Sequence, residues 1–385
     1  MHRDLGVYIH FPWCRKLCPY CDFPVVVARG EPPHQAYLDA VLAELAERAP
    51  AYEGRTLRSI YFGGGTPSLW DPACLAAAIA AVRARFPAGA APLEITVEAN
   101  PVDCEPARLA AWRAAGVERL SIGVQAWAED ELAALGRDHR MGDGPAAIAA
   151  ARAAGVEVVS ADLILGAPGV APPPPGVAPA SVHAAIASGV EHLSVYELTI
   201  EDRTAFGQRA RAGRLPMIGE DAMTELYLAT HATLTAAGFE HYEISSYARP
   251  GRRAIHNGLY WRGAEFLGLG VGAASFWRRP DGGAQRSTNT RDLRGYLAGG
   301  DGRVAERLDL DAAAVATDEL WLAMRTLDGA PEAELPPGVT SWIVDAGLGE
   351  RDRGRIRPTL RGFLFADQVA ARIVAARADA APPRE

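Results

Sequence analysis

Three cysteines near the start of the chain carry the strongest chemical signal in the sequence. Cys14, Cys18 and Cys21 form a C-x3-C-x2-C pattern directly after an apolar run at 7–11 that predicts a strand. Thiolates grouped on one short loop are ligands suited to iron–sulfur clusters and to zinc. A four-iron cluster has four metal positions, so three cysteines leave one iron available to a ligand that is not protein.

Zinc is the alternative to iron–sulfur at this loop. Structural zinc usually has four protein ligands, commonly in separated cysteine pairs. The sequence offers no second pair, because Cys74 and Cys104 stand alone and are expected to be buried thiols. His10 is close in sequence, but on the predicted strand its side chain would point away from the loop. These features favour an iron–sulfur cluster over zinc.

Further polar residues stand where predicted strands end. A glycine run, Gly63 to Gly65, is followed by Thr66. Successive glycines let the backbone approach a ligand closely, although a tight turn explains them equally well. The other strand-end residues are Glu98, Gln125, Asp162 and Glu197, with Arg137 one helix after Gln125. Carboxylates and an amide around one barrel mouth suit a ligand that carries hydroxyls, an ammonium and a carboxylate.

The elements that must position these residues alternate along the first 200 residues. Strands are predicted at 6–11, 59–62, 94–98, 119–124, 157–165 and 192–198, with helices between them at 35–48, 72–86, 106–115, 129–135, 146–154 and 181–188. Six successive strand–helix units imply a parallel sheet with helices outside it, and the carboxyl ends of such strands carry the site. A proline-rich stretch at 166–179 predicts an exposed loop, and further helices are expected at 221–237 and 312–326.

Composition limits the classes of function. The chain has 385 residues, 49% of them hydrophobic and 22% charged, which is typical of a globular protein with more than one domain. With a net charge of −8, the chain lacks the excess of positive charge with which proteins bind nucleic acid. No run approaches the roughly 20 apolar residues that span a bilayer, and no secretory signal pattern is seen. We therefore expect a cytoplasmic protein without a transmembrane segment.

The motifs together resemble a known superfamily. A C-x3-C-x2-C pattern after one strand and Gly-Gly-Gly-Thr-Pro after the next resemble the radical S-adenosylmethionine superfamily. Over essentially its whole length, the chain resembles the branch that contains the oxygen-independent coproporphyrinogen III oxidases and the HemW heme chaperones. The phrases that carry this resemblance include Cys-Pro-Tyr-Cys-Asp-Phe, Val-Glu-Ala-Asn-Pro, Leu-Ser-Ile-Gly-Val-Gln and His-Asn-Gly-Leu-Tyr-Trp.

The resemblance implies a fold, cofactors and site residues. The expected fold is α/β, a (βα)6 partial TIM barrel in residues 1–238, followed by an accessory segment in 239–310 and a small winged-helix-like cap in 311–385. Cys14, Cys18 and Cys21 would hold a [4Fe–4S] cluster, whose open iron would bind S-adenosylmethionine. The residues expected to contact S-adenosylmethionine are Tyr8, Gly64, Gly65, Thr66, Glu98, Gln125, Arg137 and Asp162.

Within that branch, three features favour the chaperones. The oxidases carry a fourth cysteine two residues after the third, where this chain has Phe23, and they carry a long arm before the cluster. The chaperones carry a His-Asn-x-x-Tyr-Trp motif associated with heme, which would make His256, Asn257, Tyr260 and Trp261 heme contacts. One departure is Ala274, which stands where chaperones usually have histidine. The resemblance implies heme and recipient hemoproteins as partners, and a homodimer; a coproporphyrinogen III oxidase remains the alternative.

Overall fold

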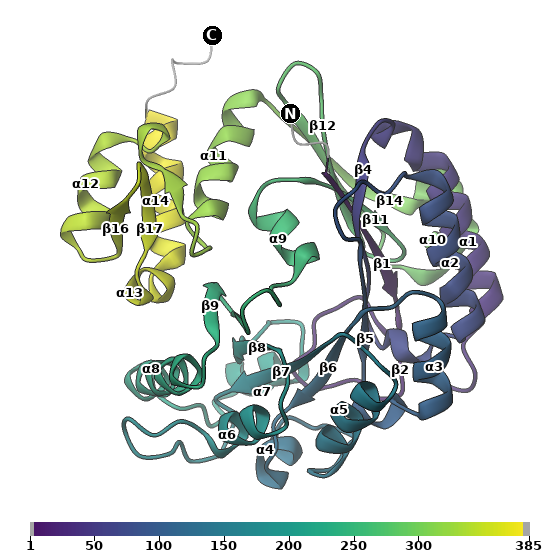
Figure 1. Cartoon of the computed structure of the whole chain (residues 1–385), viewed down its shortest axis with the longest axis horizontal. Helices are drawn as coiled ribbons and strands as arrows, with labels where there is room; N and C mark the ends of the chain where they lie inside the picture. The colour runs from purple at the N-terminus through teal and green to yellow at the C-terminus, as the bar shows by residue number, and fades with distance from the viewer. Residues whose placement is uncertain (1–3, 380–385) are drawn as a thin grey trace.

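The computed structural model of the chain describes residues 4–379, and its main feature is a curved sheet with helices on its outer face (Figure 1). Twelve strands form this sheet, in the order β14-β13-β12-β11-β1-β4-β5-β6-β7-β8-β10-β9. The strands of the predicted barrel are adjacent and parallel: β1 (Asp4–Phe11), β4 (Thr56–Gly64), β5 (Glu94–Ala99), β6 (Arg119–Gln125), β7 (Val158–Leu165) and β8 (His192–Glu197). The predicted partial barrel is therefore confirmed.

The helices between these strands also lie where the sequence predicts them, within three residues at their ends. They are α1 (His34–Arg48), α2 (Pro72–Arg85), α3 (Pro106–Ala114), α4 (Glu129–Ala134), α5 (Asp143–Ala153) and α6 (Ala180–Ala187). The start of α2 shows the local cause, since the Asp71 carboxylate accepts hydrogen bonds from the N–H groups of Ala73 and Cys74. Helix α7 (Ala205–Arg211) was not predicted. Residues 166–179 contain no helix or strand, as expected for the proline-rich loop.

Strand β1 shows how the sequence separates the barrel's outer layer from its interior. Its side chains alternate, because successive residues of a strand point to opposite faces. One set, which includes Val7, Ile9 and Phe11, is fully buried. Phe11 packs edge-to-face on Tyr37 of α1, with ring centroids 5.9 Å apart. The other set includes Tyr8, which faces the inside of the barrel. The apolar set thus anchors the helical layer, and the polar set is left for the interior.

The segment after the barrel extends the same sheet. Helix α8 (Glu220–Ala236) leads into β9 (Glu240–Glu243), β10 (Ser246–Ala248), β11 (Glu265–Leu269), β12 (Ala274–Arg278), β13 (Ala284–Asn289) and β14 (Val304–Leu310). Strand β11 pairs in parallel with β1, and the other added pairs are antiparallel. Helix α9 (Ile255–Trp261) lies on the concave side of the sheet (Figure 1), and α10 (Leu293–Ala298) lies near α1. The division of the chain at residue 238 stays a prediction.

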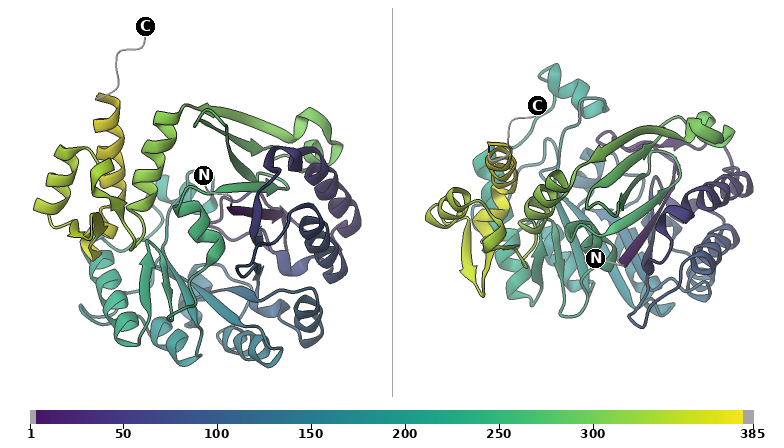
Figure 2. Two further views of the ribbon diagram at one scale, coloured as in Figure 1. Left: turned by 45° about the horizontal axis from the view of Figure 1, so that its top comes forward. Right: turned by 90° about the horizontal axis from the view of Figure 1, so that it is seen from above.

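The C-terminal residues form a small unit beside the barrel (Figure 2). It contains α11 (Ala312–Ala323), α12 (Pro337–Asp345), α13 (Leu360–Leu364) and α14 (Ala366–Asp379), together with a sheet of β15 (Ala330–Pro331), β17 (Arg355–Pro358) and β16 (Gly349–Asp352). Leu320, Ile343, Ile356 and Ile373 are buried in a core of its own. Its comparison with a winged helix stays a prediction. Across residues 4–379, no helix is both long and apolar enough to cross a membrane.

Candidate functional site

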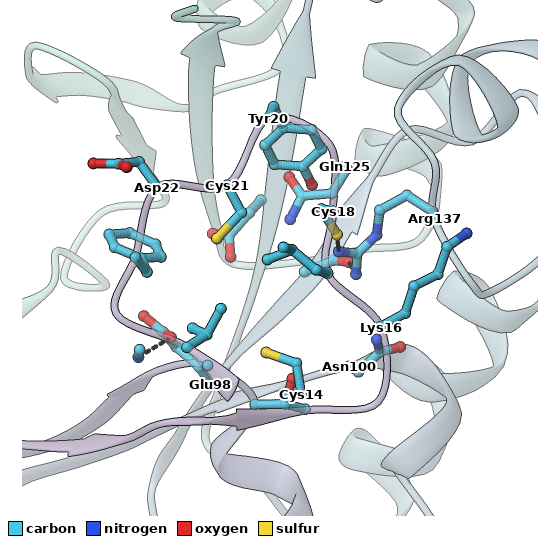
Figure 3. A pocket seen from close by; sticks show the side chains of 18 of the residues that line it. Cys14, Lys16, Cys18, Tyr20, Cys21, Asp22, Glu98, Asn100, Gln125 and Arg137 are labelled. Atoms are coloured by element: carbon cyan, nitrogen blue, oxygen red, sulfur yellow. Dashed lines mark hydrogen bonds between the residues drawn. The ribbon is translucent and has the colours of Figure 1, made fainter. Parts of the chain in front are cut away.

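The cysteine loop lies at the carboxyl end of β1. A short parallel pair, β2 (Trp13–Cys14) and β3 (Val26–Val27), fixes both ends of the loop. The N–H of Ala28 donates to the Cys14 carbonyl across 2.9 Å. Cys18 and Cys21 lie on the loop between these strands, and all three thiols line one cavity of about 690 Å³ (Figure 3). None of the three is in a disulfide.

The arrangement of the thiols fits a cluster better than a single ion. Among residues 4–379, no group of three or more His, Cys, Asp or Glu side chains is placed to hold one metal ion. A cubane does not require such convergence, because each cysteine binds a different iron. Burial raises the pKa of Cys14 to about 11 and also raises the pKa of Cys21. Because metals bind thiolates, loading the site releases protons.

Neighbouring protein atoms leave no room for a side chain at Gly64 or Gly65. A side chain at Gly65 would meet the backbone of residues 11–13 at 2.8–2.9 Å, and one at Gly64 would overlap the His10 ring. Gly64 also has a φ of +109°, which favours glycine, and its N–H donates to the Glu98 carboxylate across 3.0 Å. Gly65 and Thr66 donate backbone hydrogen bonds to Phe11 and Trp13. The run therefore joins the end of β4 to the segment that enters the cysteine loop.

His10 connects the barrel interior to the cysteine loop, so the prediction that it points away from the loop was wrong. Its Nε2 lies 3.1 Å from the Pro24 carbonyl, and its Nδ1 lies 3.0 Å from the Tyr8 hydroxyl. Burial lowers the pKa of His10 to about 4, so the ring is neutral near pH 7. A carbonyl can only accept, so Nε2 carries the proton and Nδ1 accepts from Tyr8. His10 thus supports the loop without being a metal ligand.

Two half-buried carboxylates, Glu98 and Asp162, face the cavity from β5 and β7. Glu98 accepts from the Tyr61 hydroxyl across 2.8 Å, and Asp162 accepts from the Ser121 hydroxyl across 3.0 Å. Burial raises the pKa of Glu98 to about 7, with a further increase from the charge of Asp162. Burial likewise raises the pKa of Asp162 to about 6. A cationic ligand would favour the ionised form of both groups, so the site is suited to bind one.

Gln125 and Arg137 complete the polar lining at β6. Gln125 ends the strand at an irregularity in its pairing with β7, and its φ of +65° is unusual for a residue other than glycine. Such conformations concentrate at functional sites. Arg137 donates to the Gly123 carbonyl across 2.8 Å and to the Cys18 sulfur across 3.3 Å. It therefore contacts both the strand end and the cysteine loop.

The structure brings most of the predicted site residues together. The cavity is lined by Cys14, Cys18, Cys21, Gly64, Gly65, Thr66, Glu98, Gln125, Arg137, Asp162 and Glu197. Tyr8 does not line the cavity; its ring stacks on Tyr61 behind Glu98, with centroids 6.1 Å apart. The contacts of each predicted site residue with S-adenosylmethionine stay predictions.

The four predicted heme contacts lie on α9, away from this cavity. His256 is only 2% exposed, and its ring nitrogens lie 2.7 Å from the Ser59 hydroxyl and 2.8 Å from the Tyr260 hydroxyl. Neither nitrogen is free to bind iron, so an axial-ligand role for His256 does not fit this arrangement. Heme contact by Asn257, Tyr260 and Trp261, all half-buried, stays a prediction.

Several residues that line the cavity were not predicted as site residues from the sequence. They are Asn100, Ser121, Tyr196 and Arg291. Asn100 directly follows β5 and Tyr196 is the penultimate residue of β8, so the strand-end rule would have found both, whereas Ser121 lies inside β6. Arg291 follows β13, and its guanidinium donates to the Asp22 carbonyl beside Cys21. No periodicity in the sequence places that loop against the cysteines.

Comparisons with known proteins agree with this site. Residues 8–172 match the family described as "Radical SAM superfamily". The heme chaperone HemW of Escherichia coli is 39% identical over 331 residues, which cover 86% of this chain and 85% of that protein. The heme chaperone HemW of Mycobacterium tuberculosis is 36% identical over 95% of this chain and 94% of its own length.

A solved structure supports the fold. Coproporphyrinogen III oxidase (HemN) of Escherichia coli superposes with a TM-score of 0.77, over 96% of this chain and 90% of that protein, at 23% identity. This likeness concerns the fold alone. The extent and identity of the HemW matches decide the family: the chain belongs to the HemW family of the radical S-adenosylmethionine superfamily.

Proposed function

We propose that this protein is a heme chaperone, which accepts heme and delivers it to recipient hemoproteins. The observation that carries the proposal is one cavity in which three free thiols meet two half-buried carboxylates, in a chain whose HemW relatives are named heme chaperones. The superfamily implies a [4Fe–4S] cluster and S-adenosylmethionine as cofactors. The coproporphyrinogen III oxidase alternative is less favoured, because the resemblance to HemN is one of fold.

Each part of the cavity has a proposed role. Cys14, Cys18 and Cys21 would each bind one iron, and the bound cluster would supply an electron-transfer centre with one iron open to S-adenosylmethionine. Glu98 and Asp162 would accept hydrogen bonds from the hydroxyl and ammonium groups of that ligand and balance its positive charge. The remaining contacts with S-adenosylmethionine would come from Gly64, Gly65, Thr66, Gln125 and Arg137. Tyr8 would support the site indirectly, through its stacking on Tyr61.

We also propose that the protein forms a homodimer through the cysteine loop and works in the cytoplasm. Leu17 and Phe23 on this loop are 51% and 64% exposed, and Val26 and Val27 beside them are also exposed. A cluster of exposed apolar side chains is typical of a protein interface. The free thiols are consistent with a reducing compartment. Light scattering before and after cluster loading tests the dimer, and a monomer in both states would contradict it.

Anaerobic reconstitution followed by a product assay tests the proposed function. We expect about four irons per monomer, since each cysteine binds one iron of a four-iron cluster. The reduced protein should then bind heme and should form no vinyl-bearing product from coproporphyrinogen III. Formation of that product would establish the oxidase instead. A colourless protein that holds one zinc would contradict both functions.

A further inference from the structure

Helix α9 is anchored firmly inside the barrel. The Glu94 carboxylate, at the start of β5, accepts hydrogen bonds from the N–H groups of Ile255 and His256 across 3.0 and 2.9 Å. Arg119 donates to the other oxygen of Glu94 across 2.8 Å, and both side chains are less than 10% exposed. A carboxylate at a helix N-terminus satisfies N–H groups that have no partner within the helix. The first turn of α9 therefore has a fixed position relative to β5 and β6.

The His256 ring is held in one orientation by this anchor and by two hydroxyls. Ser59 on β4 lies at its Nδ1, and Tyr260, one turn along α9, lies at its Nε2. The face of the ring stacks on Tyr61, with centroids 4.8 Å apart and an interplanar angle of 23°. Aromatic rings stacked in this way stabilise each other's position beyond the effect of burial alone.

Tyr61 connects this ring to the cavity. Its hydroxyl donates to Glu98 Oε1 across 2.8 Å, while Glu98 Oε2 accepts from the Gly64 N–H across 3.0 Å. These two donors, both on β4, fix the orientation of the Glu98 carboxylate. The contacts form a continuous path from α9 through His256 and Tyr61 to Glu98, which lines the cavity.

We infer that His256 is a positioning residue for the S-adenosylmethionine site: it holds Tyr61, and Tyr61 holds the Glu98 carboxylate toward the cavity. The inference rests on the proposed function in one respect, that Glu98 contacts S-adenosylmethionine. Loss of the His256 ring removes the packing on one face of Tyr61, so the Tyr61 hydroxyl no longer holds its acceptor in place. The affinity for S-adenosylmethionine falls, while iron and heme binding are maintained.

Four variants of the reconstituted full-length protein test this path. His256→Ala should weaken S-adenosylmethionine binding about fivefold, the effect of losing one well-placed hydrogen bond. His256→Gln should recover most of the affinity, since its amide can bond both Ser59 and Tyr260. Tyr61→Phe should weaken binding by a similar factor, and the double variant His256→Ala/Tyr61→Phe should be no weaker than Tyr61→Phe alone. Calorimetric titration with S-adenosylmethionine supplies the affinities.

Leu259→Ala is the matched control on the same helix. Leu259 is 1% exposed and packs near Gly6, and its side chain has no ring or polar group, so its removal loosens α9 without removing a member of the path. The inference is overturned if Leu259→Ala weakens S-adenosylmethionine binding as much as His256→Ala, if the effects of His256→Ala and Tyr61→Phe add, or if His256→Ala changes only heme affinity. A wild-type protein with a complete cluster but no S-adenosylmethionine binding would overturn the proposed cofactor site as well, which separates the two failures.

Discussion

The substitution Gly64→Ala tests whether His10 is fixed between the barrel and the cysteine loop. Gly64 has a φ of +109°, and an added Cβ would overlap the His10 ring. That ring is 3% exposed and bonded at both nitrogens, to Tyr8 and to Pro24. It therefore cannot move aside without breaking the hydrogen bond that supports the loop.

Two effects are expected to lower the free energy of unfolding of the Gly64→Ala variant. Placing alanine at a positive φ costs about 1–3 kcal/mol of strain. Overpacking against a fixed ring adds about 1–3 kcal/mol. Gly116→Ala isolates the first effect, because Gly116 has a φ of +95° and its added Cβ would meet nothing closer than 3.7 Å. Gly64→Ala should therefore lower the free energy of unfolding by about 1–3 kcal/mol more than Gly116→Ala does.

Urea denaturation of both variants measures this difference, and iron content after reconstitution measures its consequence. Gly64→Ala should retain less iron than wild type, because displacement of His10 releases the Pro24 carbonyl and the cysteine loop with it. Gly116→Ala should retain the wild-type iron content. Equal destabilisation and equal iron content in the two variants would refute the role assigned to His10.

Three further predictions concern charge. Burial raises the folded-state pKa of Glu98 to about 7, so its contribution to stability is complete below pH 4.5 and is lost as the pH rises to 7. Glu98→Gln should then stabilise the ligand-free protein by about 1–3 kcal/mol at pH 8 but not at pH 4.5, while weakening S-adenosylmethionine binding; equal effects on thermal stability at both pH values would contradict the assignment. Burial lowers the pKa of His192, which bonds Ser160 and Tyr242, so the protein should lose stability as the pH falls below 6.5. His192→Gln should reduce that slope by about one proton, as measured by denaturation across pH, and an unchanged slope would exclude His192 as its source. Asp103→Asn removes the charge of a buried carboxylate that pairs with half-exposed Arg15 and accepts a hydrogen bond from Ser68, so the free energy of unfolding should fall by about 1–3 kcal/mol and amide exchange in residues 14–22 should accelerate. Unchanged exchange would show that this pair does not hold the loop.

The sequence was sufficient to predict the site residues whose positions follow from one geometric rule. Glu98 and Gln125 lie within the last two residues of β5 and β6, and Asp162 lies in the carboxyl half of the neighbouring parallel strand β7. The carboxyl ends of such strands meet at one edge. Their arrangement around one cavity follows from topology, which the alternation of strand and helix patterns indicates. The cysteine cluster was predictable for a different reason, because its ligands lie within eight residues.

Residues whose roles depend on packing across the barrel were not predictable. The direction of the His10 side chain depends on how residues 12–28 fold back across the end of β1, and no local pattern encodes that path. His256 lies in a motif that predicts a ligand, yet α9 inserts it between β4 and Tyr260. That insertion depends on Glu94, which is 162 positions away in sequence. Long-range contacts of this kind require the folded structure.

Heme titration of the reconstituted protein, followed by mixing with an apo-hemoprotein, tests the central claim most directly. The proposed chaperone function predicts saturable heme binding by the cluster-loaded protein and transfer of the bound heme to the acceptor, followed by absorbance. Absence of saturable heme binding in protein that carries its full complement of iron would contradict the claim.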